Sequence, residues 1–161
     1  MLKTRNDLAA ASRGKMVNLL GAQLASAIDL QLATKQAHWN VKGPAFIALH
    51  EFFDQLAARL TGHVDEMAER ITALGGIALG GARRVARESA LESYPEGLLQ
   101  GEAHLDALAE RYAALTKNTR AAIKVAARVG DEVTADLFNE ITAALDKDLW
   151  LLEAHASHGP A

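Results

Sequence analysis

Two pairs of side chains that could bind a metal ion occur at helical spacing between residues 50 and 69. His50 and Asp54 are four residues apart, and so are Asp65 and Glu69. Residues four apart lie on one face of a helix, within reach of a common ligand. An imidazole together with carboxylates suits iron, manganese or zinc. Acids on a helix flank are more often a plain solvated face, so the spacing alone leaves both interpretations open.

The segment that must position these residues is a predicted helix over residues 44–74. Gly43 ends one helix, and Pro44 suits the first turn of the next. At 100° per residue from His50, the four polar residues lie at roughly 0–100° and an apolar stripe at roughly 240–320°. The polar residues therefore share a flank beside the stripe that would face the core. The stripe consists of Leu49, Phe53, Leu56, Leu60, Val64, Met67, Ile71 and Leu74.

One helix cannot bring both pairs to the same metal ion. His50 and Asp65 are fifteen residues apart, so their Cα atoms are separated by about 22 Å along the axis. Two copies of the helix, antiparallel across a two-fold axis, would bring the first pair of one chain opposite the second pair of the other. The midpoint of this pairing falls near Arg59 and Leu60. Because a two-fold interface is self-complementary, each dimer would carry two such sites.

The rest of the chain predicts three more long amphipathic helices, over residues 15–40, 101–129 and 131–155. Residues 76–100 form a long crossover, with a possible short helix at 89–93. The predicted fold class is all-α. It is a ferritin-like four-helix bundle, with a long crossover carrying a short helix between its second and third long helices.

Composition favours a single helical domain. Half of the 161 residues are hydrophobic and only three are proline. Residues 1–14 are polar and predict a flexible tail ahead of one domain over 15–157. Cysteine is absent, which excludes disulfides and thiolate metal sites. The net charge of −3 gives no general attraction to nucleic acid or anionic lipid.

No membrane association or export is expected. We expect no apolar run to approach the length of a membrane span. Arg13 and Lys15 precede an apolar segment that could suggest a signal peptide. Asn18 and Gln23 interrupt that segment, however, and its apolar residues follow a helical period. The sequence therefore predicts a cytoplasmic protein.

Four motifs closely resemble the Dps family, the mini-ferritins also called DNA-protection-during-starvation proteins. They are A-H-W-N-x-x-G at 37–43, F-I-A-x-H-E-x-x-D at 46–54, H-x-D-x-M-A-E-R at 63–70 and L-G-G-x-A-L-G at 74–80. The likeness covers nearly the whole chain, and the spaced histidine and acid set is highly specific. The Glu-x-x-His motif of ordinary intrachain di-iron bundles is absent from the sequence.

The resemblance implies a ferroxidase centre between two-fold-related subunits. Carried over by motif, its catalytic and metal ligands are His38, His50 and Asp54 of one subunit, with Asp65 and Glu69 of the partner. It further implies a cytoplasmic homododecamer that oxidises Fe²⁺ with hydrogen peroxide or dioxygen and stores Fe³⁺ inside its shell. In the family pattern, His38 and the partner's two acids hold the tighter iron. His50 and Asp54 support a weaker second position.

The remaining histidines and Trp39 are assigned other roles. His63 lies at roughly 220° on the helix scale, away from the polar flank, and is expected to pack against its surroundings. Trp39 is expected to pack at the end of its helix rather than to transfer electrons. His104, His155 and His158 lack partners at ligand spacing. The last two could bind metal weakly, but a frayed C-terminus is the stronger expectation.

Two charged clusters have plain explanations. Acids at the start of the last helix complement the helix dipole, although in the Dps family this region lines an acidic pore for Fe²⁺. Of these acids, Asp136 matches the family in Thr-Ala-Asp. The arginines at 83, 84 and 87 are expected to lie on a solvated loop. The acids are Asp131, Glu132, Asp136 and Glu140.

Two other function classes stay open: an architectural protein that compacts DNA, and a bundle that only mediates interactions. The complete ligand set argues against the second. DNA binding is expected to be weak or absent, because the family match at Thr4 begins close to Met1 and leaves little of the lysine-rich tail that DNA-binding members often use. Lys3 and Arg5 remain, and twelve short basic tails could still give avidity at low salt.

Overall fold

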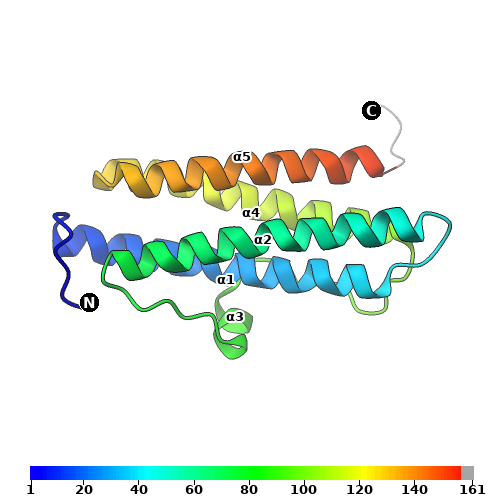
Figure 1. Cartoon of the computed structure of the whole chain (residues 1–161), viewed down its shortest axis with the longest axis horizontal. Helices are drawn as coiled ribbons and strands as arrows, with labels where there is room; N and C mark the ends of the chain where they lie inside the picture. The colour runs from blue at the N-terminus through cyan, green and yellow to red at the C-terminus, as the bar shows by residue number, and fades with distance from the viewer. Residues whose placement is uncertain (157–161) are drawn as a thin grey trace.

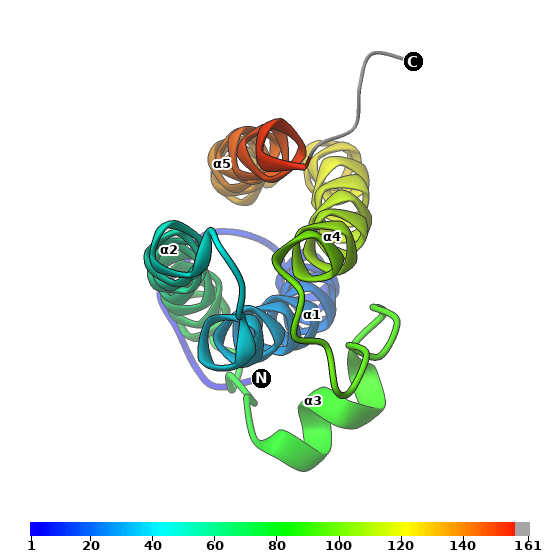
Figure 2. The same ribbon diagram turned by 90° about the vertical axis from the view of Figure 1, so that its right-hand side faces the viewer.

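The computed structural model describes residues 1–156 and contains five helices: α1 (Ala10–Asn40), α2 (Phe46–Ala73), α3 (Ala82–Glu88), α4 (Gly101–Val129) and α5 (Glu132–His155). The four long helices lie side by side along one axis, and α3 lies outside the bundle beside α1 (Figures 1 and 2). The prediction of an all-α ferritin-like bundle with a helix in the crossover is confirmed. Ser157 and His158 lie outside the described residues.

The apolar stripe of α2 forms part of the core, as predicted. Seven of its eight residues are buried, and the eighth, Val64, is half-buried. The stripe packs with apolar faces of α1, α4 and α5, including Leu20, Leu108 and Leu145. Burial of this face holds α2 in one rotational setting, because turning the helix would expose the stripe to water. The polar flank of α2 consequently faces outward.

The turn between α4 and α5 follows the sequence closely. Gly130 has φ +83°, the left-handed conformation that commonly ends a helix. Asp131 then caps α5, since its Oδ1 accepts a hydrogen bond from the Thr134 amide at 3.0 Å. The same oxygen forms an ion pair with Arg70 Nη2 at 2.7 Å. A buried carboxylate thus ties the end of α2 to the start of α5.

Helix α1 begins at Ala10, five residues before the predicted start at residue 15. Alanines 9–11 favour helix strongly, so residues 10–14 are helical although the segment is polar enough to suggest a tail. The N-terminal part of the chain has defined contacts both before α1 and in its first turn. The Leu2 amide donates to the Gly75 carbonyl at 2.7 Å, and Arg13 Nη1, in the first turn of α1, donates to the Leu74 carbonyl at 3.1 Å. These two bonds tie the N-terminal segment and the start of α1 to the end of α2.

The short crossover helix is α3, not the predicted segment at 89–93. It begins after Gly81, and Arg84 pairs with Glu88 one turn later, which supports the helix. Ser89 instead ends α3. Its Oγ donates to Asp29 Oδ2 at 2.5 Å, and the Ala90 amide donates to Ser26 Oγ at 3.1 Å. The predicted helical segment is therefore an anchor of the crossover on α1.

Helix α1 is long and apolar enough, by length and composition alone, to cross a membrane. The expectation that no apolar run approaches that length is wrong on this measure. Core helices of soluble bundles pass the same test, and α1 buries ten side chains against its neighbours in the bundle. Its apolar character is accounted for by the core it helps to form.

Candidate metal centre

The connection between α1 and α2 places His38 and His50 side by side. His38 lies in the last turn of α1 and His50 near the start of α2. The reversal between them passes through Gly43 at φ +118°, a conformation that side chains rarely adopt. The Lys42 amide donates to the Leu99 carbonyl at 2.8 Å, which pins the connection to the crossover.

Gly101 at the start of α4 packs closely against the first turns of α2. A Cβ atom at Gly101 would lie 2.4 Å from Leu49 Cδ1, so a larger residue there would push the Leu49 side chain aside. Leu49 is buried and directly precedes His50. This contact therefore lies next to the histidine pair.

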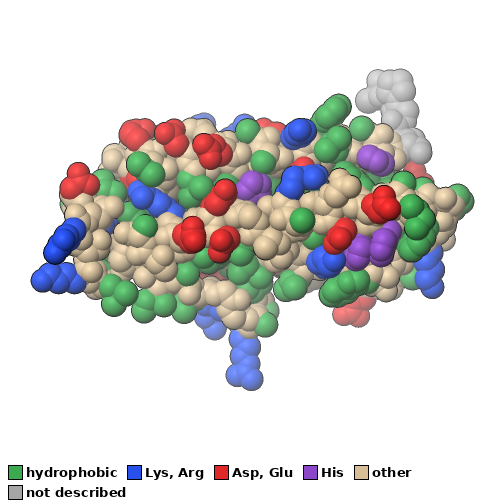
Figure 3. Space-filling view, viewed as in Figure 1, with side chains coloured by type: hydrophobic (Ala, Val, Ile, Leu, Met, Phe, Trp, Pro, Cys, Tyr) green, Lys and Arg blue, Asp and Glu red, His purple; other side chains and the backbone are tan. Residues whose placement is uncertain are grey.

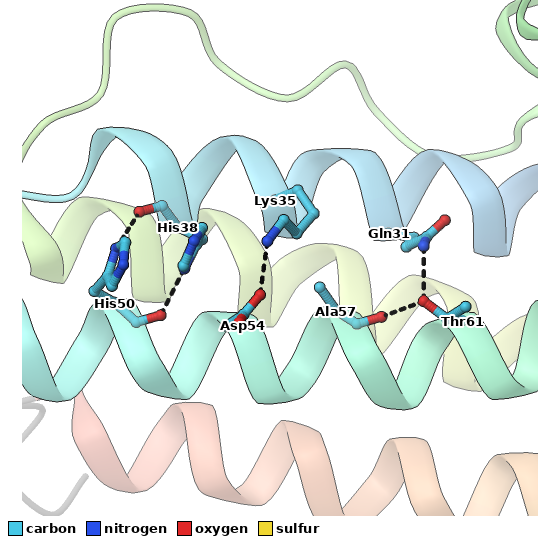
Figure 4. Close-up of polar contacts among 7 residues, drawn as sticks. All are labelled: Gln31, Lys35, His38, His50, Asp54, Ala57 and Thr61. Carbon is cyan, nitrogen blue, oxygen red and sulfur yellow. Dashed lines mark hydrogen bonds and ion pairs between the residues drawn. The ribbon is translucent and has the colours of Figure 1, made fainter.

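The two imidazole rings stack and hold each other by reciprocal hydrogen bonds (Figure 4). Their centroids are 3.8 Å apart and their planes differ by 21°. His38 Nδ1 donates to the His50 carbonyl at 2.7 Å, and His50 Nδ1 donates to the His38 carbonyl at 2.8 Å. Each neutral ring then carries its lone pair on Nε2. This arrangement, one nitrogen bonded to a backbone carbonyl and the other free, is that of metal-binding histidines.

Asp54 lies one turn beyond His50 on the same outer flank of α2. Both histidines and Asp54 line a shallow, open hollow with Glu51, Gln55 and Ala58. The side chain of Asp54 is 58% exposed. One chain thus supplies two imidazoles and one carboxylate to a surface hollow, and this set is chemically suited to a divalent transition metal ion.

Lys35 completes this cluster, and the sequence reasoning missed it. Its Nζ lies 2.6 Å from Asp54 Oδ1 (Figure 4). The hydrogen bond from Lys35 lowers the pKa of Asp54, and the positive charge of the lysine acts in the same direction. The available signal was its position three residues before His38 on the same helix, which places both on one face.

Asp65 and Glu69 lie farther along α2 and are exposed. Within the described part of the chain, no hydrogen bond or ion pair engages either carboxylate. The structure does not bring them to the histidine pair, and residues 1–156 hold no group of three or more ligand side chains around one point. Each chain therefore presents two separate partial sites on one face, where acids spread along α2 (Figure 3).

Comparison with known proteins identifies the family. The family model for the ferritin-like domain matches residues 17–160. A DNA protection during starvation protein of Agrobacterium fabrum is 46% identical over 153 residues, covering 95% of this chain and 94% of the relative. The chain belongs to the Dps family.

Solved Dps structures share the fold over almost their whole length. Mycobacterium smegmatis Dps is 31% identical with a TM-score of 0.93, covering 100% of this chain and 91% of that one. DpsA14 from Streptomyces coelicolor is 34% identical with a TM-score of 0.91, covering 98% and 95%. Dps proteins are generally iron-oxidising mini-ferritins that protect DNA under stress.

Two aromatic side chains of this Dps chain differ from expectation. Trp39 does not pack at the helix end, because it is 66% exposed. His155 belongs to α5 rather than to a frayed end: its ring stacks on Phe52 at 4.5 Å, and its Nδ1 donates to the Leu151 carbonyl at 2.7 Å. His104, for which the sequence offers no partner at ligand spacing, is buried and hydrogen-bonded to Tyr94 at 2.6 Å. His63 is mostly buried and lies 3.3 Å from Glu66, so packing describes it well.

The acids of α5 separate into two kinds. Asp131 is buried, paired with Arg70 and used as a cap, so it cannot line a pore. Glu132, Asp136 and Glu140 are exposed. The basic run lies on α3 rather than on a loop: it comprises Arg83, Arg84 and Arg87, and two of them pair with Glu88.

Proposed function

We propose that this Dps protein is a ferroxidase and an iron store. Its substrates are Fe²⁺ and hydrogen peroxide, or dioxygen, and it acts at sites between two-fold-related subunits of a cytoplasmic homododecamer. The Fe³⁺ product is held as mineral inside the shell, which protects the cell from oxidative stress. The carrying observation is the reciprocally bonded pair of His38 and His50, which lines an open hollow together with Asp54.

Each ligand has a defined part in the proposal. His38, His50 and Asp54 of one subunit bind iron together with Asp65 and Glu69 of the partner subunit. The latter two fit this role because their carboxylates are exposed and uncommitted within the described chain. A set of five protein ligands for two ions leaves coordination positions open for the oxidant, which a redox site needs.

The chemistry follows from pairing two iron ions. Each Fe²⁺ gives up one electron, and one hydrogen peroxide accepts both as its O–O bond breaks, leaving two Fe³⁺ and two hydroxide ions. Because both electrons go to the same peroxide, no hydroxyl radical is released. The expected stoichiometry is therefore about one peroxide per two irons, which follows from a paired site.

The test is anaerobic addition of Fe²⁺ and peroxide to the purified protein, with peroxide consumption and ferric absorbance followed together. Asp65→Ala/Glu69→Ala should oxidise iron at the rate of protein-free solution, while Glu66→Ala/Glu102→Ala, which removes the same charge from exposed acids elsewhere, should match the parent. Equal rates for parent and Asp65→Ala/Glu69→Ala would show that the site is wrongly assigned. Size-exclusion chromatography on the same sample tests the dodecamer.

The second candidate function, DNA compaction, finds less support. Phosphate binding needs clustered cations, whereas each chain carries a net charge of −3 and twelve copies would form a strongly anionic particle. We expect no gel shift of linear duplex DNA at submicromolar protein near physiological salt. Retardation under those conditions would contradict this and direct attention to Lys3, Arg5 and the arginines of α3.

A further inference from the structure

The ion pair between Lys35 and Asp54 lies inside the proposed centre rather than beside it. Lys35 Nζ is 2.6 Å from Asp54 Oδ1, and Figure 4 shows the ammonium between α1 and α2, one turn from the ring of His38. An oxygen that accepts a hydrogen bond from lysine at this distance cannot give the same lone pair to a metal ion. The lysine ammonium therefore occupies the position that a metal ion bound by Asp54 would need.

The net charge of the site indicates how the lysine affects the binding of a second metal ion. The five proposed ligands comprise two neutral imidazoles and three carboxylates, a total of −3, and Lys35 brings the total to −2. One divalent cation then balances the charge of these six side chains, and Glu51, which lines the same hollow, adds one further negative charge. A second divalent cation would therefore find little attraction left and would meet a positive ammonium at the carboxylate it requires.

The side chain of Lys35 is able to leave. It is 30% exposed, and its partner Asp54 is 58% exposed, so the ammonium can move into water without a large desolvation cost. Glu51 lines the same hollow and offers a second carboxylate nearby. The pair is therefore one that a stronger cation can separate, unlike the buried pair of Arg70 and Asp131.

We propose that Lys35 is a displaceable internal cation. It pairs with Asp54 until a second divalent ion binds that carboxylate in its place. This competition makes the second ion bind more weakly than the first. This inference rests on the proposed function, because it presumes that Asp54 is a ligand. It gives Lys35 a positioning role toward the second ion and no contact with the oxidant.

The magnitude is set by the repulsion between the ammonium and the incoming ion. A single and a double charge about 4 Å apart in a water-like surrounding repel enough to weaken binding roughly thirtyfold. Movement of the lysine and screening by salt reduce this. Removing the charge should therefore tighten the second ion on the order of tenfold.

The experiment measures ion binding without redox chemistry. Assembled protein is titrated with Co²⁺ in the absence of oxidant and followed by visible absorption, and with Zn²⁺ by calorimetry. Four proteins are compared: the parent, Lys35→Met, Lys35→Arg, and Lys15→Met as a matched loss of an exposed charge on the same helix. The parent and a His38→Ala/His50→Ala variant are titrated in parallel to locate the binding.

Lys35→Met should bind the weaker class of ions about tenfold more tightly and change the tighter class much less. Lys35→Arg, which keeps the charge, and Lys15→Met should resemble the parent. An unchanged or weakened second class in Lys35→Met would overturn the proposal, since the lysine would then only order Asp54. So would an arginine variant that behaves like the methionine variant.

The same titrations separate this failure from failure of the function. If the parent binds ions and the double histidine variant does not, insensitivity to Lys35 removes only the role given to the lysine. If the parent binds no more than the double histidine variant, the site assignment is wrong and both proposals fall together.

Discussion

His38 and His50 differ from His104 in how their two ring nitrogens are used. In the stacked pair, each Nδ1 donates to a backbone carbonyl and each Nε2 is left beside an open hollow. His104 is 1% exposed, is hydrogen-bonded through Nδ1 to the Tyr94 hydroxyl, and packs edge-on against Phe53. Burial lowers the pKa of His104, an effect partly offset by the Leu98 backbone carbonyl. Both kinds of histidine are ordered by hydrogen bonds, but only the half-buried pair lines an open hollow, because His104 is enclosed in the core.

The carboxylates divide in the same way. Asp131 and Asp148 are each 2% exposed and are paired with Arg70 and Arg59 across helices. Asp65 and Glu69 are exposed and uncommitted within the described chain. Asp54 lies between the two classes, because it is exposed yet held by a lysine. Burial with an arginine indicates a stabilising role, whereas exposure beside an ordered histidine pair indicates a binding role.

The largest expected effect tests the buried class. Asp131→Ala removes the cap of α5 and leaves Arg70, whose side chain is only 15% exposed, without its charge partner. The free energy of unfolding should fall by about 3–5 kcal/mol, measured by urea denaturation. Asp136→Ala, an exposed acid on the same helix, should change it by less than about 0.5 kcal/mol. Similar losses for the two variants would break the comparison.

The next effect tests the half-buried histidine pair at the hollow. His38→Gln/His50→Gln should lower peroxide-driven iron oxidation at least about a hundredfold. Losing only the hydrogen-bond partner of a metal ligand already costs about 10- to 100-fold in affinity or activity, and here the ligands themselves are lost. Circular dichroism and melting should remain close to the parent. His104→Gln should show the reverse pattern, with lower stability and near-normal activity per folded protein. Loss of activity in His104→Gln at full stability would contradict the division.

Complementation tests whether the two exposed partial sites meet across subunits. A variant lacking His38 and His50 and another lacking Asp65 and Glu69 should each be inactive. In a mixed dimer, one site collects all four changes and the other is intact. Random co-assembly of equal amounts should therefore restore about a quarter of parental activity. Absence of recovery in shells shown by mass spectrometry to be mixed would count against the two-fold geometry.

The smallest effect concerns pH and the buried histidine. The folded-state pKa of His104 lies below its ordinary value of 6.5 because burial disfavours the charged ring. As pH falls below about 6.5, the unfolded chain binds a proton that the folded chain does not, so stability decreases with a slope of up to about 1.4 kcal/mol per pH unit. His104→Gln should lose this part of the slope in denaturation series at several pH values. An unaltered slope would assign the pH dependence to other groups.

Most of the fold could be predicted from the periodicity of the sequence. Apolar residues spaced three and four apart predicted the buried face of α2, and Gly130 with Asp131 predicted the turn before α5. Both signals act over a few neighbouring residues. The crossover helix was misplaced. Glycines at 80 and 81 with a run of arginines resemble a loop, whereas the stabilising contact is the i,i+4 pair of Arg84 and Glu88.

The candidate site was only partly open to prediction. Spacing indicated His50, Asp54, Asp65 and Glu69, and the family motif added His38. The reciprocal bonds between the histidines depend on the relative height of two helices, and no local pattern encodes that height. The same is true of Lys35, since its partner lies nineteen residues away on another helix.

The hydrogen bond between the Leu2 amide and the Gly75 carbonyl holds the N-terminus at one end of the bundle. Helix α1 spans 31 residues, about 45 Å, from this bond's end of the bundle to the histidine pair. Gly75 has φ +81°, and a Cβ there would lie 2.8 Å from the Leu2 carbonyl oxygen, so position 75 accepts no side chain while Leu2 is bound there. An affinity tag or fluorophore joined ahead of Met1 would leave the bundle at the far pole from the hollow of its own chain (Figure 1). Glu69 lies six residues before Gly75, so in the proposed two-fold pairing such a label would report from the end of the bundle that supplies carboxylates to the histidine pair of the partner subunit.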